Sequence, residues 1–255
     1  MTDRVAITAL AGIPLVSAGD DLAAIAIAGL GATGITPQDD DVLVVAQKIV
    51  SKAEDRIVDV AAVTPSPRAK ALAAEVEKDP RLVEIILSES RRVVRRRPNL
   101  LIVEHRLGYV MANAGIDHSN VAAEDGTERV LLLPLDPDGS AEALRRALVA
   151  HFGVRIAVIV SDSFGRPWRR GTVGVALGAA GLPAMIDWRG HPDLFGRPLL
   201  VTETGFADEI AAAASLVMGQ ADEAMPMALV RGLRWKAPDL PGLALVRPAE
   251  HDLFR

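Results

Sequence analysis

The sequence contains no cysteine and few aromatic residues. The absence of cysteine excludes disulfides, thiolate nucleophiles and thiolate metal ligands. Aromatic residues make up only 4% of the chain, with Tyr109 as the single tyrosine, which is too few for a platform that stacks single-stranded nucleic acid. Positive charge is also not in surplus, because the formal net charge is −5. This balance argues against broad nucleic-acid binding, so any anionic ligand must be held by a local cluster of cations.

Long hydrophobic runs are missing as well. Glycine, proline or charged residues interrupt every apolar run within about ten residues, whereas a membrane-spanning helix needs about 20. The N-terminal stretch has a short apolar middle between acidic residues, which is unlike a signal peptide. We therefore expect a cytoplasmic protein that does not contact membranes.

The composition that remains is typical of a globular protein. Half of the 255 residues are hydrophobic and 24% are charged, which is enough to form a buried core. The hydrophobic period switches between helix and strand several times, and helices do not alternate strictly with strands. This pattern predicts an α+β fold with mixed sheets and flanking helices. We expect one catalytic unit over residues 1–255, with two possible subdomains and an inserted segment near 90–153.

Local patterns predict individual elements. Helices are expected at 19–30, 65–78, 80–94, 140–152 and 207–218, and strands at 41–47, 130–135, 155–162 and 227–233. Residues 99–115 resemble a hairpin with its turn near Leu107 and Gly108. The basic run from Arg91 to Pro98 is interpreted as a solvated helix end, because cations favour helix C-termini.

The segment 44–54 places Gln47, Lys48, Ser51 and Lys52 directly after a predicted strand. A lysine at a strand end can neutralise a phosphate group. The alternative is a set of solvated lysines, which is the usual state of this residue.

The segment 113–121 contains Asp117 and, three residues later, Asn120. A carboxylate with neighbouring amide and hydroxyl groups suits a hard cation such as Mg²⁺ or Mn²⁺. An Asx-rich turn uses the same residue types, so the pattern leaves both interpretations open.

In segment 161–171, a predicted buried strand ends at Asp162 and Ser163, and three arginines follow at positions 166, 169 and 170. An acid beside several arginines can hold a metal and contact phosphate oxygens together. The alternative is a structural Asp–Arg network anchored by Trp168.

The segment 218–226 follows a predicted helix and precedes a strand, so it is interpreted either as a loop over a ligand or as a plain connection. The sequence has no GxxxxGK[ST] motif, so a bound nucleotide would be held without a P-loop.

These segments together resemble the coenzyme F420-0:L-glutamate ligase family. The similarity rests on VVAQKIVSKAE, KDPRLVEIILSES, NAGIDHSNV, LLLPLDPDGSAEALR, SDSFGRPWRRG and MGQADEAMP, which follow one another in this order. The resemblance implies a stand-alone enzyme with an α+β fold that forms an intertwined homodimer. It also implies binding of GTP and of two divalent ions, Mg²⁺ or Mn²⁺, with K⁺ as a further cation.

The resemblance also implies roles for individual residues. The nucleotide would be bound by Gly12, Ile13, Pro14, Leu15, Gln47, Lys48, Lys52, Asn120, Met218, Gly219, Gln220 and Ala221. Metal ligands would be Asp117, Asp162, Ser163 and Gln220, and the catalytic set would be Asp117, Asp162, Lys52, Arg166 and Arg169. The family pattern has glutamate at the position of Gln220, and a neutral amide is a weaker ligand for a hard cation.

The implied reaction joins the carboxylate of F420-0 to the amine of L-glutamate. GTP would phosphorylate the carboxylate, and glutamate would then attack the acyl phosphate. Two other functions stay open at this point: an amide ligase that acts on another phosphorylated acid, and a non-catalytic GTP-binding protein.

Overall fold

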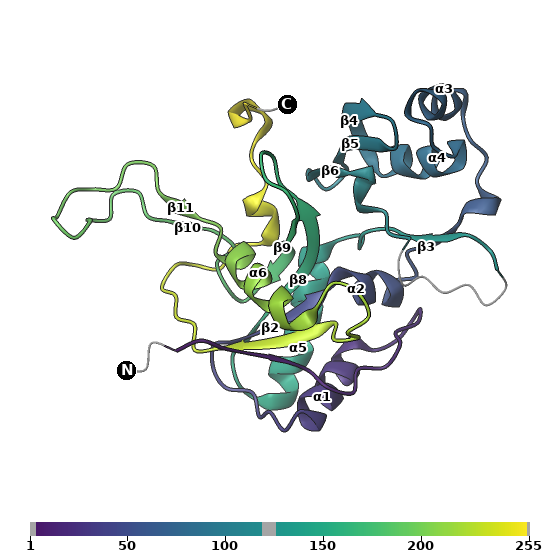
Figure 1. The fold of residues 1–255 in the computed structure, drawn as a ribbon. Coiled ribbons are helices and arrows are strands. Elements are labelled where there is room, and N and C mark those ends of the chain that lie inside the picture. Colours follow the sequence, from purple (N-terminus) through teal and green to yellow (C-terminus); the bar gives the residue numbers. More distant parts are fainter. Residues whose placement is uncertain (1–3, 119–125, 254–255) are drawn as a thin grey trace.

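A mixed five-stranded sheet forms the centre of the molecule, and the computed structural model describes residues 4–118 and 126–253. The strands lie in the order β1 (Ala6–Ala9), β12 (Met227–Arg231), β2 (Asp41–Ala46), β8 (Ile156–Gly165) and β9 (Thr172–Ala180). Strands β2 and β8 are parallel, while the other neighbours are antiparallel. The predicted α+β class with mixed sheets is thus confirmed (Figure 1).

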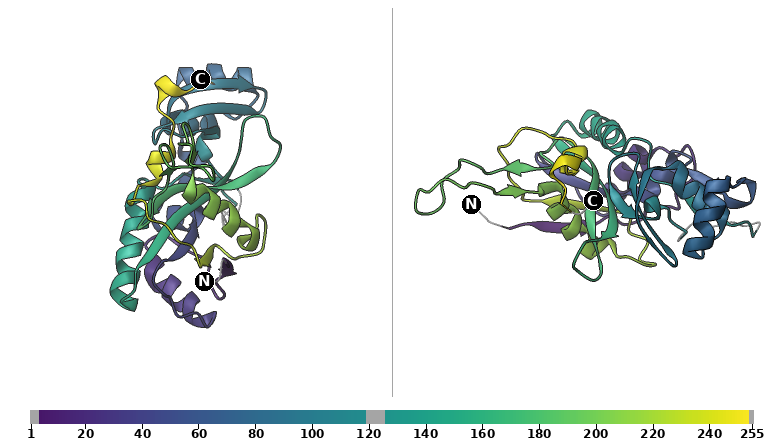
Figure 2. Two further views of the ribbon diagram at one scale, coloured as in Figure 1. Left: turned by 90° about the vertical axis from the view of Figure 1, so that its left-hand side faces the viewer. Right: turned by 90° about the horizontal axis from the view of Figure 1, so that it is seen from above.

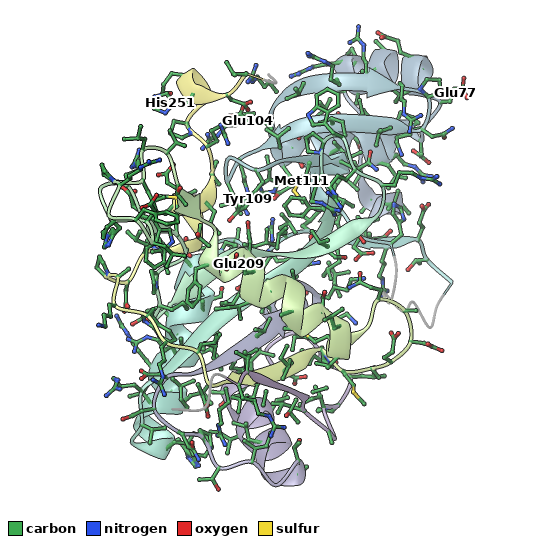
Figure 3. The ribbon with its side chains drawn as sticks, turned by 60° about the vertical axis from the view of Figure 1, so that its left-hand side comes forward. Glu77, Glu104, Tyr109, Met111, Glu209 and His251 are labelled. Carbon is green, nitrogen blue, oxygen red and sulfur yellow. The ribbon has the colours of Figure 1, made fainter. Side chains whose placement is uncertain are left out.

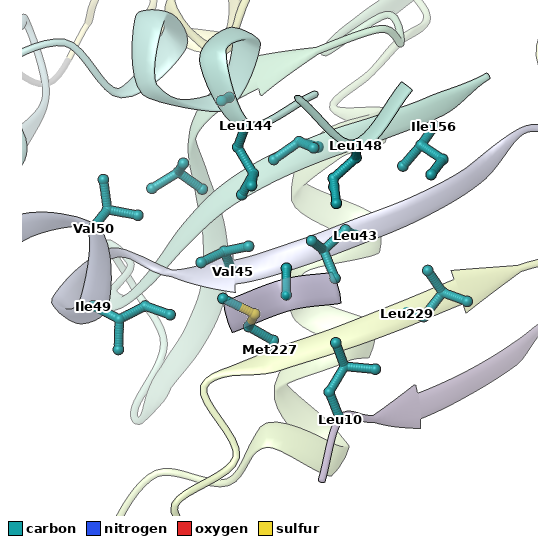
Figure 4. Packing of buried hydrophobic residues seen from close by; sticks show 14 of the residues in the cluster. Leu10, Leu43, Val45, Ile49, Val50, Leu144, Leu148, Ile156, Met227 and Leu229 are labelled. Carbon is teal, nitrogen blue, oxygen red and sulfur yellow. The ribbon is translucent and has the colours of Figure 1, made fainter. Parts of the chain in front are cut away.

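Helices cover both faces of this sheet. Helices α1 (Leu22–Ala32) and α5 (Pro137–Phe152) pack on one face, and α6 (Phe206–Met218) packs on the other. Successive residues of β2 alternate between the two cores: Leu43 and Val45 face α5, and Val42 and Val44 face α6. A strand buried on both sides has an unbroken apolar sequence, which explains DVLVVA. Figure 4 shows the first of these cores, with Leu144 and Leu148 of α5 above β2.

A second lobe is built from the chain between α2 (Gln47–Ala53) and β7 (Arg129–Leu131). It contains α3 (Pro67–Val76), α4 (Pro80–Ser88) and a sheet of β4 (Ser90–Arg97), β5 (Leu100–His105) and β6 (Val110–Ala112). This lobe has its own core, which includes Leu72, Val83, Leu101 and Val103. Strand β3 (Ile57–Asp59) pairs with β7 where the chain leaves and re-enters the main unit. The inserted segment was expected near 90–153; of those residues, 137–152 form α5 on the main sheet.

The lobe is tied to the main unit by a buried carboxylate. The Glu89 Oε2 atom lies 2.9 Å from Arg56 Nη2 and 3.0 Å from Arg106 Nε. Both arginines also donate to backbone carbonyls on the other side of the junction, at Leu133 and Leu135. Burial opposes ionisation of Glu89, but His105, Arg106 and Arg56 outweigh it and lower the pKa of this carboxyl to about 2.

An arm extends from the main unit on the side away from the lobe (Figures 1 and 2). Its base is the two-stranded ribbon of β10 (Ile186–Asp187) and β11 (Glu203–Thr204). Several apolar side chains beyond this base are almost fully exposed: Leu194 at 99%, Phe195 at 87%, Leu200 at 78% and Val201 at 84%.

The interpretation of Arg91–Pro98 as a helix end is wrong. Helix α4 stops at Ser88, and residues 90–97 form β4, which pairs antiparallel with β5. The long-range pairing with β5 decides this, because the half-buried Val93 packs into the core of the lobe. The arginines of this edge strand find acidic partners: Arg91 and Arg92 approach Glu104, and Arg96 approaches Glu75.

Other predicted elements differ mainly at their ends. Helix α5 begins at Pro137 rather than near Ser140, because Asp136 caps it and proline suits the first helical position. It ends at Gly153 as expected, with a φ of 69°. The strand expected at 130–135 covers only 129–131, and β8 continues to Gly165 instead of ending at Asp162. The hairpin at 99–115 is confirmed.

Within the described residues, none of the helices has the length and apolar character that would let it cross a membrane.

Candidate functional site

The candidate site lies where the parallel strands β2 and β8 end. Residue Ala46 of β2 is paired with Ser161 of β8, so Gln47 and Asp162 follow at neighbouring points of the sheet. Ligands of sheets with parallel strands bind at the carboxyl ends of those strands, because the chain leaves the sheet there and opens a crevice. The parallel pairing of β2 and β8 thus explains why two segments far apart in sequence contribute to one site.

Helix α2 places two lysines at this edge. Lys48 and Lys52 are one turn apart, so their side chains project from the same face of the helix. The Lys48 Nζ atom lies 2.6 Å from Asp117 Oδ2. Burial lowers the pKa of Lys52, and the neighbouring charge of Lys48 lowers it further. Two lysines are therefore clustered at this strand end, one of them paired with Asp117.

Asp117 reaches the site from the lobe. Its backbone forms two hydrogen bonds with Leu131, each 2.9 Å long, which fix the chain where it returns toward β7. The side chain is 21% exposed, and its ion pair with Lys48 joins the lobe to α2. The site is therefore assembled from both units of the molecule.

Asp162 provides a second carboxylate on β8. Its pKa is raised to about 6, mainly by burial and also by the charge of Asp117, although the Ser163 N–H and Lys48 act in the opposite direction. The Ser163 N–H donates to Asp162 Oδ1 at 2.7 Å and thereby orients the carboxylate. Two acidic groups that influence one another in this way form a region that favours a bound cation.

The loop after α6 forms another wall. Gly219 adopts a φ of 75° and a ψ of −177°, a conformation open essentially to glycine alone. A side chain there would also collide with the carboxyl group of Glu223. That carboxylate accepts the Ala221 N–H at 2.8 Å, and such backbone hydrogen bonds lower the Glu223 pKa. Glu223 thus holds the loop in a tight turn beside the cleft.

These walls enclose a cleft of about 600 Å³, which is within the usual range for a small-molecule site. The lining residues come from four segments of the chain: Ile13 to Val16, Ala46 to Ile49 with Lys52, Ser161 to Ser163 with Gly174, and Ser215 with Met218 to Pro226. Leu15 is an apolar side chain at the cleft with 92% of its surface exposed, so it is available to a ligand.

Most of the residues selected from the sequence line this cleft. They are Ile13, Pro14, Leu15, Gln47, Lys48, Lys52, Asp162, Ser163, Met218, Gly219, Gln220 and Ala221. Asp117 is connected to it through Lys48. Gly12 precedes the lining segment, and Asn120 lies outside the described residues.

The arginines of segment 161–171 lie elsewhere in this single chain. Because β8 continues past Asp162, Arg166, Arg169 and Arg170 fall in the turn between β8 and β9. They are not among the residues that line the cleft, and Arg166 donates to the Gly171 carbonyl at 3.4 Å. Their catalytic role stays a prediction.

Sequence reasoning gave no role to several residues that line the cleft, among them Ser161, Gly174 and Ser215. Ser161 lies one position before Asp162, Gly174 is paired with Ser163, and Ser215 lies three residues before Met218 on α6. A signal existed for Gly174, because glycine inside a strand often marks a close approach of backbone. Here a side chain would overlap the Ala211 carbonyl of α6.

Comparison with known proteins connects this cleft to an enzyme family. A sequence profile described as F420-0:Gamma-glutamyl ligase matches residues 12–232. The chain belongs to this family. Coenzyme F420:L-glutamate ligase of Methanothermobacter thermautotrophicus is 49% identical over 246 residues, with 96% of both chains covered. The enzymes of that name from Methanopyrus kandleri and Archaeoglobus fulgidus are each 46% identical, covering 93% and 90% of this chain and 92% and 88% of their own length.

The oxygen donors of this F420-0:gamma-glutamyl ligase family member fit a hard divalent cation. The carboxylates of Asp117 and Asp162, the Ser163 hydroxyl and the Gln220 amide are ligand types that Mg²⁺ and Mn²⁺ accept. In the described part of the chain, His, Asp and Glu residues form no cluster of three or more that could enclose an ion. Mg²⁺ in proteins commonly takes one or two carboxylates and completes its shell with water and substrate phosphates.

Proposed function

We propose that this ligase uses GTP to attach L-glutamate to coenzyme F420-0. The single observation that carries the proposal is the cleft, which is lined by Lys48, Lys52 and Asp162 and is connected to Asp117 through Lys48. The relatives of this chain are named coenzyme F420:L-glutamate ligase. A carboxylate and an amine do not condense at neutral pH without activation. A nucleoside triphosphate would supply that activation by phosphorylating the carboxylate to an acyl phosphate.

The residues of the cleft have distinct tasks in this proposal. Lys48 and Lys52 would neutralise phosphate oxygens, and burial together with the neighbouring charge of Lys48 lowers the pKa of Lys52. Asp117 and Asp162 would hold divalent metal, which supplies charge compensation for the transferring phosphoryl group when bound. Ser163 and Gln220 would contribute further oxygen ligands.

The cleft walls would align the reacting groups. Ile13, Pro14 and Leu15 provide an apolar part of the wall, and the loop 218–225, which also lines the cleft, would cover the nucleotide. Alignment of two substrates converts their reaction into an effectively unimolecular step, which accounts for a large part of such catalysis. The chemistry therefore needs no protein nucleophile, in keeping with a chain that has no cysteine.

We also propose that the protein works as a homodimer. The arm carries exposed Leu194, Phe195, Leu200 and Val201, and monomeric proteins rarely leave so many apolar side chains of one segment in water. A second copy of the chain would cover them.

The reaction is tested by incubating the protein with F420-0, L-glutamate, GTP and Mn²⁺ and following the products by mass spectrometry. We expect mono- and diglutamyl products with GDP released in step. Metal-dependent GTP binding without products would discard F420-0 as the acceptor and direct the search to other phosphorylated acids. Neither products nor GTP binding would refute the proposed function.

A further inference from the structure

A second cavity of about 330 Å³ lies along the hairpin of β8 and β9, and its lining residues Phe164 and Val175 directly follow Ser163 and Gly174 of the cleft. We propose that it binds the flat conjugated ring of the F420-0 acceptor, an inference that rests on the proposed function. We call it the ring pocket. Its apolar lining residues are Tyr109, Phe164, Pro167, Val175, Leu245 and Val246.

The position of the ring pocket relative to Asp162 supports this assignment. Phe164 follows Asp162 by two residues on β8, so both side chains project from the same face, roughly 7 Å apart at a strand rise of about 3.4 Å per residue. Val175 of β9 is the direct cross-strand partner of Asp162. An acceptor whose ring contacts Phe164 would therefore extend its acidic end toward Asp162.

The chemistry of the lining also favours an aromatic ligand. The only tyrosine of the chain and one of its five phenylalanines lie here, although aromatic residues are scarce elsewhere. The Tyr109 hydroxyl donates to the Leu177 carbonyl, which fixes its ring against the pocket. Tyr109 packs with Met111 at the junction of the lobe and the main sheet (Figure 3).

The turn beside the pocket holds a further aromatic side chain in an unusual position. Trp168 follows Pro167, is 86% exposed, and adopts a φ of 65°, a region that bulky residues rarely enter. Such a conformation persists only where the surrounding structure imposes it, and these sites often contact ligands.

The other substrates fit this pocket less well. Its charged lining residues are Asp208, Asp252 and Arg247, a balance that disfavours a small anion such as glutamate. The phosphates of a nucleotide find Lys48 and Lys52 in the larger cleft instead. The conjugated ring is the part of the acceptor that gains most from an apolar, aromatic surface.

The test measures binding of F420-0 to the full chain by fluorescence anisotropy of its deazaflavin, without GTP. Phe164→Leu keeps apolar volume but removes the flat ring, and we expect affinity to fall about tenfold. The matched control is Phe152→Leu, which alters a half-buried phenylalanine of the α1–α5 core. It should bind F420-0 as the unchanged chain does.

A second probe and a second variant make the result specific. The deazaflavin riboside without phosphate and acid should lose affinity for Phe164→Leu by the same factor, because only the ring enters the pocket. Val246→Asp places a charge in the pocket from the C-terminal segment rather than from the sheet. Val246→Asp should lower the affinity for both probes. This second variant keeps the test decisive if Phe164→Leu does not fold.

The outcomes separate this inference from the proposed function. If the unchanged chain forms glutamylated product while both variants bind both probes normally, the ring pocket is wrongly assigned and the function stands. A change in oligomeric state without a change in binding would assign the pocket to a subunit contact and overturn the inference. If the unchanged chain neither binds nor glutamylates F420-0, the proposed function fails and the inference fails with it.

Discussion

Asp162 lies at the boundary between the buried sheet and the cleft, and its environment opposes its charge. Burial raises its pKa to about 6, yet the Ser163 N–H and Lys48 favour the ionised form. A carboxylate kept in such a position is unfavourable for stability unless a cation offsets it. The position is therefore better explained by ligand binding than by folding.

We predict that Asp162→Asn lowers turnover by about 100-fold or more, as loss of an electrostatic contact to a reacting group commonly does. The fold should survive, because asparagine has nearly the same shape and removes a half-buried charge. Product formation and thermal unfolding, measured on the same preparation, check both parts. Near-normal turnover in a well-folded variant would contradict the assignment.

Glu89 gives a prediction of pH-dependent stability. Its folded pKa, about 2, is below the ordinary value near 4.5, so its stabilisation is present above pH 4.5 and is lost as the pH falls toward 2. The stabilisation amounts to about 3 kcal/mol, since one pKa unit corresponds to about 1.36 kcal/mol. Urea unfolding at pH 7 and at pH 3 should show the larger part of this loss, because pH 3 is still above the folded pKa.

In Glu89→Gln the same measurement should give lower stability at pH 7 and a smaller difference between the two pH values. Glu75→Gln serves as the control, because Glu75 is paired with Arg96 on the surface of the lobe, where both side chains are more than half exposed. Exposed pairs contribute little to stability. Equal behaviour of the two variants would show that the junction does not depend on Glu89.

At the scale of elements, helix packing on the sheet depends on glycine. A side chain at Gly178 of β9 would overlap the Pro137 carbonyl at the start of α5. We predict that Gly178→Ala destabilises the protein by about 1–3 kcal/mol, the range typical of overpacking. Chemical denaturation measures the effect.

Gly31 of α1 provides the matched comparison, because a side chain there meets no atom within 4 Å. Gly31→Ala should stabilise the protein slightly, by about 0.5–1 kcal/mol, since alanine is the better helix former. A loss of stability in Gly31→Ala similar to that in Gly178→Ala would contradict the packing explanation.

The elements also show how far the sequence could be interpreted. Apolar periodicity identified β2, α3, α6 and β12, because the spacing of apolar residues within each segment matches the residues that are buried. It failed for β4, where an arginine-rich segment becomes a strand through pairing with β5. The prediction from periodicity also placed the end of β8 too early, because pairing with β9 extends the strand past Asp162.

The site shows the same division. Motif order selected most residues of the cleft, but their meeting depends on the parallel register of β2 and β8 and on the path that returns Asp117 from the lobe. Local periodicity predicts neither this register nor this path of the chain. The arginines after Asp162 were placed in the site because the strand was expected to end there, whereas the structure puts them in a turn.

At the scale of the whole molecule, the arm and the lobe extend to opposite sides of the main sheet (Figure 2). We predict that replacing Leu194 and Phe195 by aspartate converts a dimer into a monomer, because charge would prevent the arm from being buried against a second copy. Sedimentation analysis gives the mass. Aspartate at Leu216, which is 83% exposed on α6, is the control and should leave the mass unchanged. A monomeric mass for the unchanged chain would refute the homodimer.

The cleft joins two kinds of wall, and this has a kinetic consequence. Asp162 belongs to β8, which has a hydrogen-bonded strand on each side, whereas the loop 219–226 joins α6 to β12 and turns around Glu223. Amide hydrogens of β8 should exchange with solvent only on opening of the sheet, and those of the loop on far smaller fluctuations. Nucleotide binding should thus slow amide exchange mainly in the loop. Exchange in β8 should hardly differ between the free and the bound protein.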